Sequence, residues 1–353
     1  MTTNTQKRPV VTLLLEDGTT YKSKSFGAIG TVVGEIVFNT AMSGYQEIIS
    51  DPASAGQIIT MTYPEIDNYG VNEDDFEAEK PTALGMIVKN HNPIYSHYKA
   101  KRSLGEYFKE HGLIGIENID TRSIVKKIRE NGAMNCLMTT DELDEGKREM
   151  LKNYKPDPDI VMSVTPKKPV VYGKGRKIKL ALLDCGCKKS TVESLTELSC
   201  EVTAYPASTP AAKILDGGHS AIFLSSGPGN PADCKAQIET VREITGKLPI
   251  YAVGLGAQIL ALALGAKTYK LKYGHHGANH PIMNTKTGKV AMALQNHGYS
   301  IEEGSLPDTT EVTHINLNDK TLEGFESKKL KLRAVQFYPE SFDEWVNTMK
   351  KGK

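Results

Sequence analysis

The stretch Ala252-Val253-Gly254-Leu255-Gly256-Ala257-Gln258 decides the fold of the C-terminal half, because it joins two apolar segments through a tight turn. The run Ile250 to Val253 before it has the length of a buried strand, and Ile259 to Leu264 after it continue as a helix. A strand, a tight turn and a helix are typical of a nucleophile elbow, which holds one strained residue at a helix N-terminus. The residue at the apex is Gly254, which has no side chain that could attack a substrate.

Apolar strand runs alternate with helical stretches around this turn. Such alternation predicts βαβ units around a parallel sheet with helices on both faces. The expected strands are 178–183, 202–205, 221–224 and 250–253. Sites in such sheets lie at the carboxyl ends of the strands. A second glycine-rich loop, Ser225 to Pro231, follows the third strand there, and in it Gly227 and Gly229 would let backbone amides approach a bound group closely. Either loop alone is equally well explained as a tight turn.

The first part of the chain predicts a mixed domain, with strands first and helices later. Val10 to Leu15, the turn Glu16-Asp17-Gly18 and Thr19 to Tyr21 predict a β-hairpin. Two helices are expected between 103 and 132; the first starts with a capping box, and each ends at a glycine. The residues that carry these signals are Ser103, Glu106, Gly112, Asp120 and Gly132.

A chain of 353 residues is longer than one hydrophobic core usually serves, so we expect two domains. Between 151 and 176 the apolar periodicity fails and prolines occur among lysines, which predicts a linker. The expected organisation is an N-terminal domain at 1–150, a linker at 151–176 and a C-terminal domain at 177–353. The fold class is α/β, a mixed β-rich domain followed by an open, mainly parallel sheet.

The composition is typical of an ordinary soluble protein, with 39% hydrophobic and 24% charged residues and a net charge of +1. This balance gives no reason to expect a nucleic-acid or membrane partner. Met1 to Pro9 are polar and the apolar run behind them is too short for a signal peptide or a membrane span, so a cytoplasmic location is expected. The cysteines are odd in number and scattered, which predicts reduced thiols. They are Cys136, Cys185, Cys187, Cys200 and Cys234.

No metal site is predicted. Cys185-Gly186-Cys187 has one intervening residue rather than two, and no second pair accompanies it. His275, His276 and His280 occur in a Gly-rich, loop-like stretch without the helical i, i+4 spacing that places two imidazoles on one metal. We interpret them as surface or backbone-anchoring histidines. A Walker-type loop is also missing from the sequence, so no cofactor is expected in this chain.

Several stretches of the second domain resemble the glutaminase domain of carbamoyl-phosphate synthase small chains. They are Leu260 to Lys270, Gly274-His275, Asn279-His280-Pro281, Gln295 to Tyr299, Val312 to Asp319 and Gln336 to Glu340. Two stretches of the first domain, Phe38 to Ile48 and Met61 to Pro64, resemble the N-terminal domain of the same family. The resemblance covers about residues 10 to 340 and implies a class I glutamine amidotransferase domain at the C-terminus.

In that family a Cys-His-Glu triad hydrolyses glutamine, and the ammonia passes through a tunnel to a large synthetase chain. The resemblance places Gly254 at the cysteine position, Tyr338 at the histidine position and Glu340 at the glutamate position. Only Glu340 is retained. A phenol with an ordinary pKa near 10 is a poor base near neutral pH, so the sequence predicts a small chain that cannot hydrolyse glutamine.

The resemblance also transfers the glutamine-binding positions. They are Ala53, Gly227, Gly229, Leu255, Gln258, Asn296, Gly298 and Tyr299. At Ala53 the family has a serine, and Ala252 and Ala257 replace a family glycine and histidine. The backbone frame of the pocket is thus expected to remain while its reactive side chains are lost.

The resemblance implies a heteromeric complex with a carbamoyl-phosphate synthase large chain. That partner would bind ATP and Mg²⁺ and form carbamoyl phosphate from ammonia and bicarbonate, for arginine or pyrimidine biosynthesis or both. A second hypothesis is a regulatory or small-molecule-binding pseudoenzyme, whose pocket holds glutamine or another metabolite. A third, an active amidase with displaced chemistry, would require ammonia release from glutamine by the purified chain.

Overall fold

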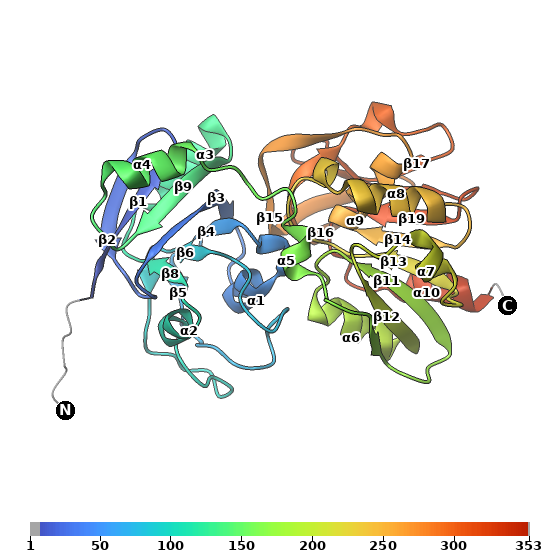
Figure 1. Cartoon of the computed structure of the whole chain (residues 1–353), viewed down its shortest axis with the longest axis horizontal. Coiled ribbons are helices and arrows are strands. Elements are labelled where there is room, and N and C mark those ends of the chain that lie inside the picture. The colour runs from blue at the N-terminus through green and yellow to red at the C-terminus, as the bar shows by residue number, and fades with distance from the viewer. Residues whose placement is uncertain (1–7, 352–353) are drawn as a thin grey trace. The chain divides into compact units, whose positions relative to one another are not determined.

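The computed structural model describes residues 8–351, with side chains to residue 349, and the chain divides into two compact units between Pro156 and Asp157 (Figure 1). Each unit has its own sheet and its own hydrophobic core. Within residues 8–351, no helix combines the length and the apolar character needed to cross a membrane.

The first unit is built on a seven-stranded mixed sheet in the order β2-β1-β9-β3-β4-β6-β8. The predicted hairpin is confirmed: β1 and β2 pair antiparallel with Leu14 opposite Thr20. Strands β3, β4, β6 and β8 pair in parallel. The strands of this sheet are β1 Val10–Leu15, β2 Thr20–Lys24, β3 Thr31–Asn39, β4 Gln57–Met61, β6 Gly85–Ile87, β8 Ile114–Ile116 and β9 Met134–Thr139. Two short strands, β5 Glu65–Ile66 and β7 Asn90–His91, pair with each other.

The predicted helix signals of the first unit are confirmed. The Ser103 hydroxyl accepts from the Glu106 N–H at 3.1 Å and the Glu106 carboxylate accepts from the Ser103 N–H at 2.8 Å, which completes a capping box. Asp120 caps the next helix by accepting from the Ser123 N–H at 3.0 Å. The helices of this unit are α1 Tyr45–Ser50, the 3-10 turn η1 Pro52–Ser54, α2 Leu104–Glu110, α3 Thr121–Asn131 and α4 Glu145–Lys152.

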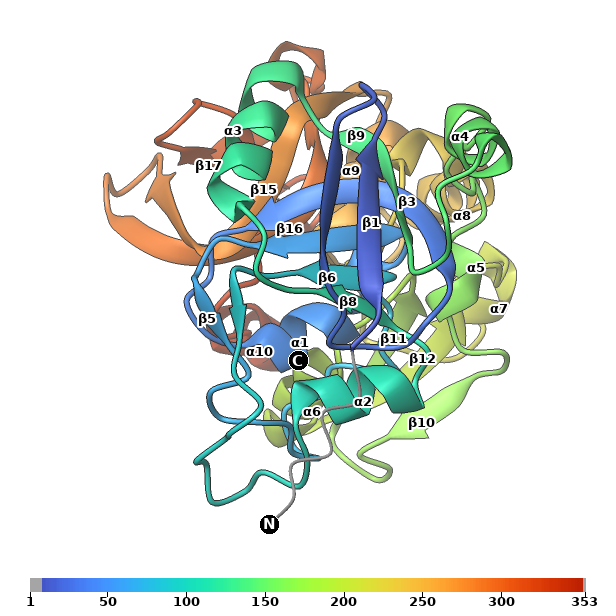
Figure 2. The ribbon, with the colours of Figure 1, turned by 90° about the vertical axis from the view of Figure 1, so that its left-hand side faces the viewer.

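These helices cover both faces of the first sheet. Helices α1 and α2 pack on β3, β4 and β6 through Ile49, Tyr107 and Phe108. Leu151 of α4 packs on β1, β3 and β9, and α3 contacts β3 and β4. Figure 2 shows α3 and α4 on opposite sides of β1.

The second unit contains a ten-stranded sheet in the order β10-β12-β11-β13-β14-β19-β18-β17-β15-β16. The four strands expected from the sequence are present as β11 to β14 and pair in parallel, and β19 continues the parallel part beside β14. Antiparallel strands extend the sheet at both edges. The strands are β10 Val170–Tyr172, β11 Ile178–Asp184, β12 Cys200–Pro206, β13 Ala221–Leu224, β14 Ile250–Val253, β15 Thr268–Asn284, β16 Val290–Ile301, β17 Glu311–Asn316, β18 Leu322–Ser327 and β19 Leu332–Val335.

Helices lie on both faces of this sheet, as predicted (Figure 1). Ile214, Val241 and Ile259 of α7, α8 and α9 belong to one core, and Leu195 of α6 and Trp345 of α10 belong to the other. Residues 151–176, for which the sequence predicts a linker, contain the short helix α5 and the strand β10, which pairs with β12. The helices are α5 Val161–Val164, α6 Lys189–Glu197, α7 Ala211–Leu215, α8 Lys235–Ile244, α9 Leu255–Ala263 and α10 Asp343–Lys351, with the 3-10 turns η2 Pro231–Asp233 and η3 Glu303–Ser305.

One expectation is wrong. The stretch with His275, His276 and His280 is not a loop, because all three residues lie in β15, and His275 and His276 are buried rather than at the surface. The glycines that suggested a loop mark irregular pairing instead: the β15–β16 register shifts between Lys270 and His275 and again between Gly277 and His280. The five cysteines are free thiols, as predicted.

Candidate functional site

The elbow predicted from the sequence is present between β14 and α9. Gly254 has φ 56° and ψ −121°, a backbone conformation that residues with a side chain adopt only under strain. Its N–H donates to the Val335 carbonyl of β19 at 2.9 Å, and its carbonyl accepts from the Ala257 N–H at 3.0 Å. The turn is therefore anchored to the neighbouring strand and to the first turn of α9.

The loop after β13 packs directly against the elbow. The Gly256 N–H donates to the Ser225 carbonyl at 2.9 Å, and a Cβ atom added at Gly254 would lie 3.1 Å from the Ser226 Cβ. A Cβ atom at Gly227 would lie 2.1 Å from the Cys185 carbonyl oxygen, so only glycine fits there. The two glycine-rich loops thus meet at the carboxyl ends of adjacent strands, as expected for a site in this kind of sheet.

Tyr338 follows β19 and bridges to β16, since its N–H donates to the Leu294 carbonyl at 2.9 Å. The ammonium group of Lys188, which precedes α6, lies 4.1 Å from the centroid of the Tyr338 ring. Lys188 is only 5% exposed, so this is a desolvated cation–π contact. Glu340, two residues further on, is exposed. No sequence pattern points to Lys188, because its contact with Tyr338 joins residues that are 150 positions apart in the chain.

The expected glutamine-site positions are partly brought together. Gln258 of α9 donates through Nε2 to the Tyr299 carbonyl of β16 at 2.7 Å and to the Gln336 Oε1 at 3.0 Å. Leu255 is buried at the start of α9, where its side chain faces Gly227. The two bonds of Gln258 join the elbow helix to β16 and to the residue that follows β19.

Other expected positions have local roles in the structure. The Asn296 Oδ1 accepts from the His276 Nδ1 at 2.8 Å, and Gly298 has open space where a Cβ atom would lie. Gly229 has φ 89°, which favours glycine. Ala53 lies in the first unit, buried in η1, with its N–H donating to the Asp51 Oδ1 at 3.0 Å.

The nearby cysteines are not activated nucleophiles. Burial raises the pKa of the Cys185 thiol well above its ordinary value, and burial raises the pKa of Cys234 to about 12. Asp184, at the end of β11, accepts from the N–H groups of Gly186 and Cys187, yet burial outweighs these bonds and raises its pKa to about 6. The thiols therefore stay protonated near neutral pH, where a thiolate would be needed for attack.

A group of titratable side chains lies on β15, β16 and β18. His275 Nε2 is 2.8 Å from the Asp319 Oδ2, His275 Nδ1 is 3.2 Å from the Glu323 Oε1, and His297 Nε2 is 3.9 Å from the Glu323 Oε2. Burial alone would lower the pKa of His275, but the two carboxylates outweigh it and raise the pKa to about 9. Burial lowers the pKa of His297 to about 4. We call His275, His297 and Glu323 the His-His-Glu cluster.

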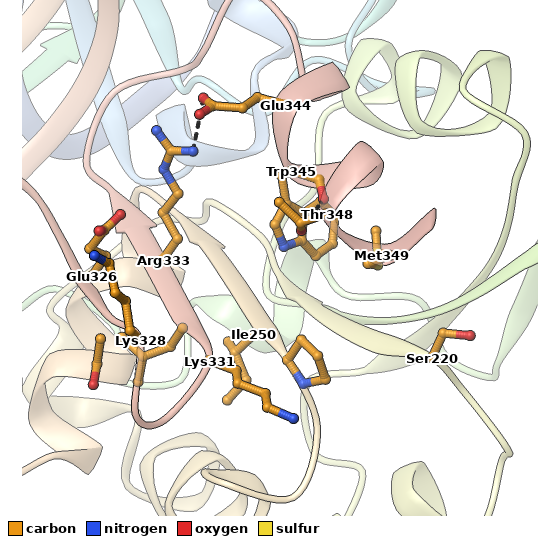
Figure 3. A pocket seen from close by; sticks show the side chains of 13 residues that line it. Ser220, Ile250, Glu326, Lys328, Lys331, Arg333, Glu344, Trp345, Thr348 and Met349 are labelled. Carbon is orange, nitrogen blue, oxygen red and sulfur yellow. Dashed lines mark hydrogen bonds and ion pairs between the residues drawn. The ribbon is translucent and has the colours of Figure 1, made fainter. Parts of the chain in front are cut away.

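A surface pocket of about 700 Å³ lies at the other end of the strands. It is lined by Ser220, Pro249 and Ile250, where β13 and β14 begin, and by Arg333, Trp345 and others (Figure 3). Arg333 pairs with Glu344 at 2.9 Å across its rim. Because the elbow is at the carboxyl ends of these strands, this pocket is not the site that the elbow would serve.

Comparison with known proteins covers both units. Residues 13–138 match the family model for the carbamoyl-phosphate synthase small chain, CPSase domain, and residues 181–345 match that for glutamine amidotransferase class I. The carbamoyl phosphate synthase small chain of Fusobacterium nucleatum is 42% identical over 96% of this chain and 97% of that protein. The small chain of Syntrophotalea carbinolica is 39% identical over 97% of this chain and 98% of that protein.

Among solved structures, a glutamine amidotransferase from Thermotoga maritima covers 50% of this chain and 83% of its own, with 18% identity and a TM-score of 0.38. A match this distant adds no argument. The family is established by the full-length relatives and the two family models, which agree with the sequence motifs in both units. The chain therefore belongs to the carbamoyl-phosphate synthase small chain family, with a class I glutamine amidotransferase domain as its C-terminal part.

Proposed function

We propose that this small chain does not hydrolyse glutamine and supports an ammonia-using large synthetase chain in carbamoyl phosphate formation. The observation that carries the proposal is the residue at the elbow: Gly254 lies at the apex between β14 and α9, where the family motif has its cysteine. Tyr338 and Glu340 occupy the positions that match the histidine and the glutamate.

The chemistry of glutamine hydrolysis requires a nucleophile and a base at this place. Gly254 supplies no atom that could form the covalent intermediate, and the Tyr338 ring is covered by the Lys188 ammonium group. In another hydrolase, loss of the nucleophile or the base alone lowers the rate roughly 10⁶-fold. Cys185 and Cys234 do not compensate, because burial raises the pKa of both thiols.

The partner follows from the family. A small chain implies a large chain, and residues 13–138 of this chain match the N-terminal domain of the family in addition to the amidotransferase domain. The large chain would bind ATP and Mg²⁺ and use free ammonia and bicarbonate. The carbamoyl phosphate would enter arginine or pyrimidine biosynthesis.

The first experiment measures ammonia release from glutamine by the purified chain, alone and with its large chain. We expect none above the background of a mock preparation. A cysteine-directed glutamine analogue should also leave residue 254 unlabelled. Turnover that persists after removal of contaminating glutaminases would overturn the proposal. Binding of glutamine without turnover would instead favour a regulatory pocket built on the Gln258–Tyr299 frame.

The second experiment tests the complex. The chain and its large chain should co-elute in gel filtration, because a stable interface of this kind buries more than about 1,000 Å². The complex should form carbamoyl phosphate with ammonium chloride and not with glutamine. A chain that elutes alone in the presence of the matching large chain would remove the basis for a supporting role.

A further inference from the structure

We propose that the His-His-Glu cluster is a binding site for one divalent transition-metal ion of the Zn²⁺ class, with His275 Nδ1, His297 Nε2 and a Glu323 oxygen as ligands. The candidate ligand atoms all lie within 4.8 Å of one another, and all three residues are buried. The proposal is independent of glutamine chemistry and departs from the sequence-based expectation that the chain has no metal site.

The hydrogen bonds of the two imidazoles determine which nitrogens face the centre. His297 Nδ1 lies 2.8 Å from the Tyr299 carbonyl, which can only accept, so Nδ1 carries the proton and Nε2 has a free lone pair. His275 Nε2 lies 2.8 Å from the Asp319 carboxylate and donates to it, which leaves Nδ1 on the inner side. A metal-bound imidazole commonly donates its second N–H to a carboxylate or a backbone carbonyl, and these two histidines do both.

The inner atoms are poorly satisfied. His297 Nε2 and Glu323 Oε2 are buried without a hydrogen bond, and His275 Nδ1 forms an ion pair with the Glu323 Oε1 at 3.2 Å. His297 Nε2 and Glu323 Oε2 face each other at 3.9 Å, and both are acceptors. Two buried lone pairs that face each other are costly unless a cation lies between them. A proton on His275 Nδ1 could be donated to the Glu323 Oε1 at 3.2 Å. It would not compensate the pair of His297 Nε2 and Glu323 Oε2.

The spacing suits a tetrahedral ion. Zn–N and Zn–O bonds of about 2.0–2.2 Å put neighbouring ligand atoms about 3.3 Å apart. His275 Nδ1 lies 3.2 Å from Glu323 Oε1 and His297 Nε2 lies 3.9 Å from Glu323 Oε2, so each imidazole is near this separation from one oxygen of the carboxylate. Two imidazoles and one carboxylate are a ligand set that Zn²⁺ uses with a water as fourth ligand.

Further side chains hold the ligands in place. Glu323 Oε1 accepts from Asn316 Nδ2 at 3.3 Å and from Thr321 Oγ1 at 3.4 Å. The ring of His280 lies 5.1 Å from that of His275, and both of its nitrogens are buried without a hydrogen bond.

The site would join strands that are distant in sequence. His275 and His297 are paired across β15 and β16, and Glu323 lies on β18, which also contacts β16. The Tyr299 carbonyl that orients His297 also accepts from Gln258 of the elbow helix. An ion here would fix the β15–β16 ribbon to the central sheet, a structural role.

The test uses the full-length chain, stripped with a chelator and supplied with Zn²⁺ alone. We expect one Zn²⁺ per chain by mass spectrometry of the metal content and by calorimetry, together with a Zn²⁺-dependent rise in the melting temperature. Glu323→Gln and His297→Gln should each lower the affinity for Zn²⁺ at least about 10-fold. Loss of an outer hydrogen-bond partner of a metal ligand already costs about that much, and loss of the ligand itself should cost more. The matched control His219→Gln lies outside the cluster, where its Nε2 is 2.9 Å from the Tyr205 hydroxyl, and should bind like the wild type.

Co²⁺ provides a test that needs no variant. A ligand set of two nitrogens and one oxygen gives the visible absorption of four-coordinate Co²⁺ without a thiolate charge-transfer band. Such a band would assign the ion to the cysteines and overturn the proposal. Failure of the wild type to retain Zn²⁺, or equal affinity in Glu323→Gln, His297→Gln and the wild type, would also overturn it.

Discussion

The elbow and the His-His-Glu cluster lie in the same unit, but the elbow is defined by its backbone conformation and the cluster by its buried side chains. At the elbow the backbone adopts a strained turn, with φ 56° and ψ −121° at Gly254, and this apex residue has no side chain. In the cluster the backbone is ordinary strand with two register shifts, and the chemistry lies in buried side chains from β15, β16 and β18.

The difference shows that the backbone geometry of the elbow does not need a side chain at its apex. The elbow turn is stabilised by its own hydrogen bonds, from Gly254 to Val335 and from Gly256 to Ser225, which do not require a cysteine. The cluster is not stabilised by backbone hydrogen bonds in this way. Its polar atoms are buried, and each one depends on the others or on a bound cation for compensation.

The largest effect on stability is expected in the cluster. Glu323→Gln should lower the free energy of unfolding by about 3–5 kcal/mol, because it removes the buried carboxylate that faces His275 and His297. Chemical denaturation in the presence of a chelator measures it. The control Glu326→Gln, on the same strand, breaks an exposed pair with Lys286 at 2.7 Å and should cost less than about 1 kcal/mol. Equal losses in both variants would show that the cluster is not a special part of this unit.

The second prediction tests the elbow by restoring its side chains. Gly254→Cys alone should not hydrolyse glutamine, since the tyrosine at the position that matches the family histidine is a poor base near neutral pH. Adding Tyr338→His should raise the rate roughly 10²-fold over the single variant, the lower end of what a general base contributes. A further Ala53→Ser should increase it again. Ammonia release is the measurement, and robust turnover by Gly254→Cys alone would show that the site is less depleted than we infer.

The third prediction concerns the strain that glycine avoids. Gly254→Ala should cost about 1–3 kcal/mol, because alanine is disfavoured at this φ and ψ and its Cβ would lie 3.1 Å from the Ser226 Cβ. Gly246→Ala is the matched control, with φ 82° and open space around the added carbon, and should cost about 1 kcal/mol. Thermal unfolding of the two variants compares them. If both lose the same stability, the elbow conformation carries no extra strain.

The smallest effect concerns pH. Burial, followed by Arg333, lowers the pKa of His314 in β17 to about 4, below the unfolded value of about 6.5. Between pH 4 and pH 6.5 the unfolded chain therefore binds more protons than the folded chain. The contribution of the neutral His314 ring to the free energy of unfolding is complete above pH 6.5 and is lost as the pH falls toward 4. Since the ring is only partly buried, we expect a loss of about 1–2 kcal/mol.

The measurement for His314 is the change in unfolding free energy between pH 7 and pH 5. His314→Gln should lose less stability than the wild type over this range. The exposed His97→Gln should behave like the wild type. A pH dependence in His314→Gln that equals the wild type would remove His314 as its source.

Much of the fold could be predicted, because its signals are local. The capping box at Ser103, the cap at Asp120 and the strand at Ile250–Val253 depend on residues a few positions apart. The prediction of a loop at His275 to His280 was wrong because the pairing of this segment with β16 is not a local property of the sequence. Glycines there accompany a bulge, and the register shift brings His275 and His280, five residues apart, to a ring distance of 5.1 Å.

The sequence by itself determined the turn at Gly254, the tyrosine at position 338 and the family motifs in both units, since each is a property of neighbouring residues. Only the tertiary structure decided that Lys188 lies over the Tyr338 ring and that Glu323 meets His275 and His297. These contacts join strands and loops that are far apart along the chain. Their partners are set by sheet order, register and bulges, which no local pattern of residue types encodes.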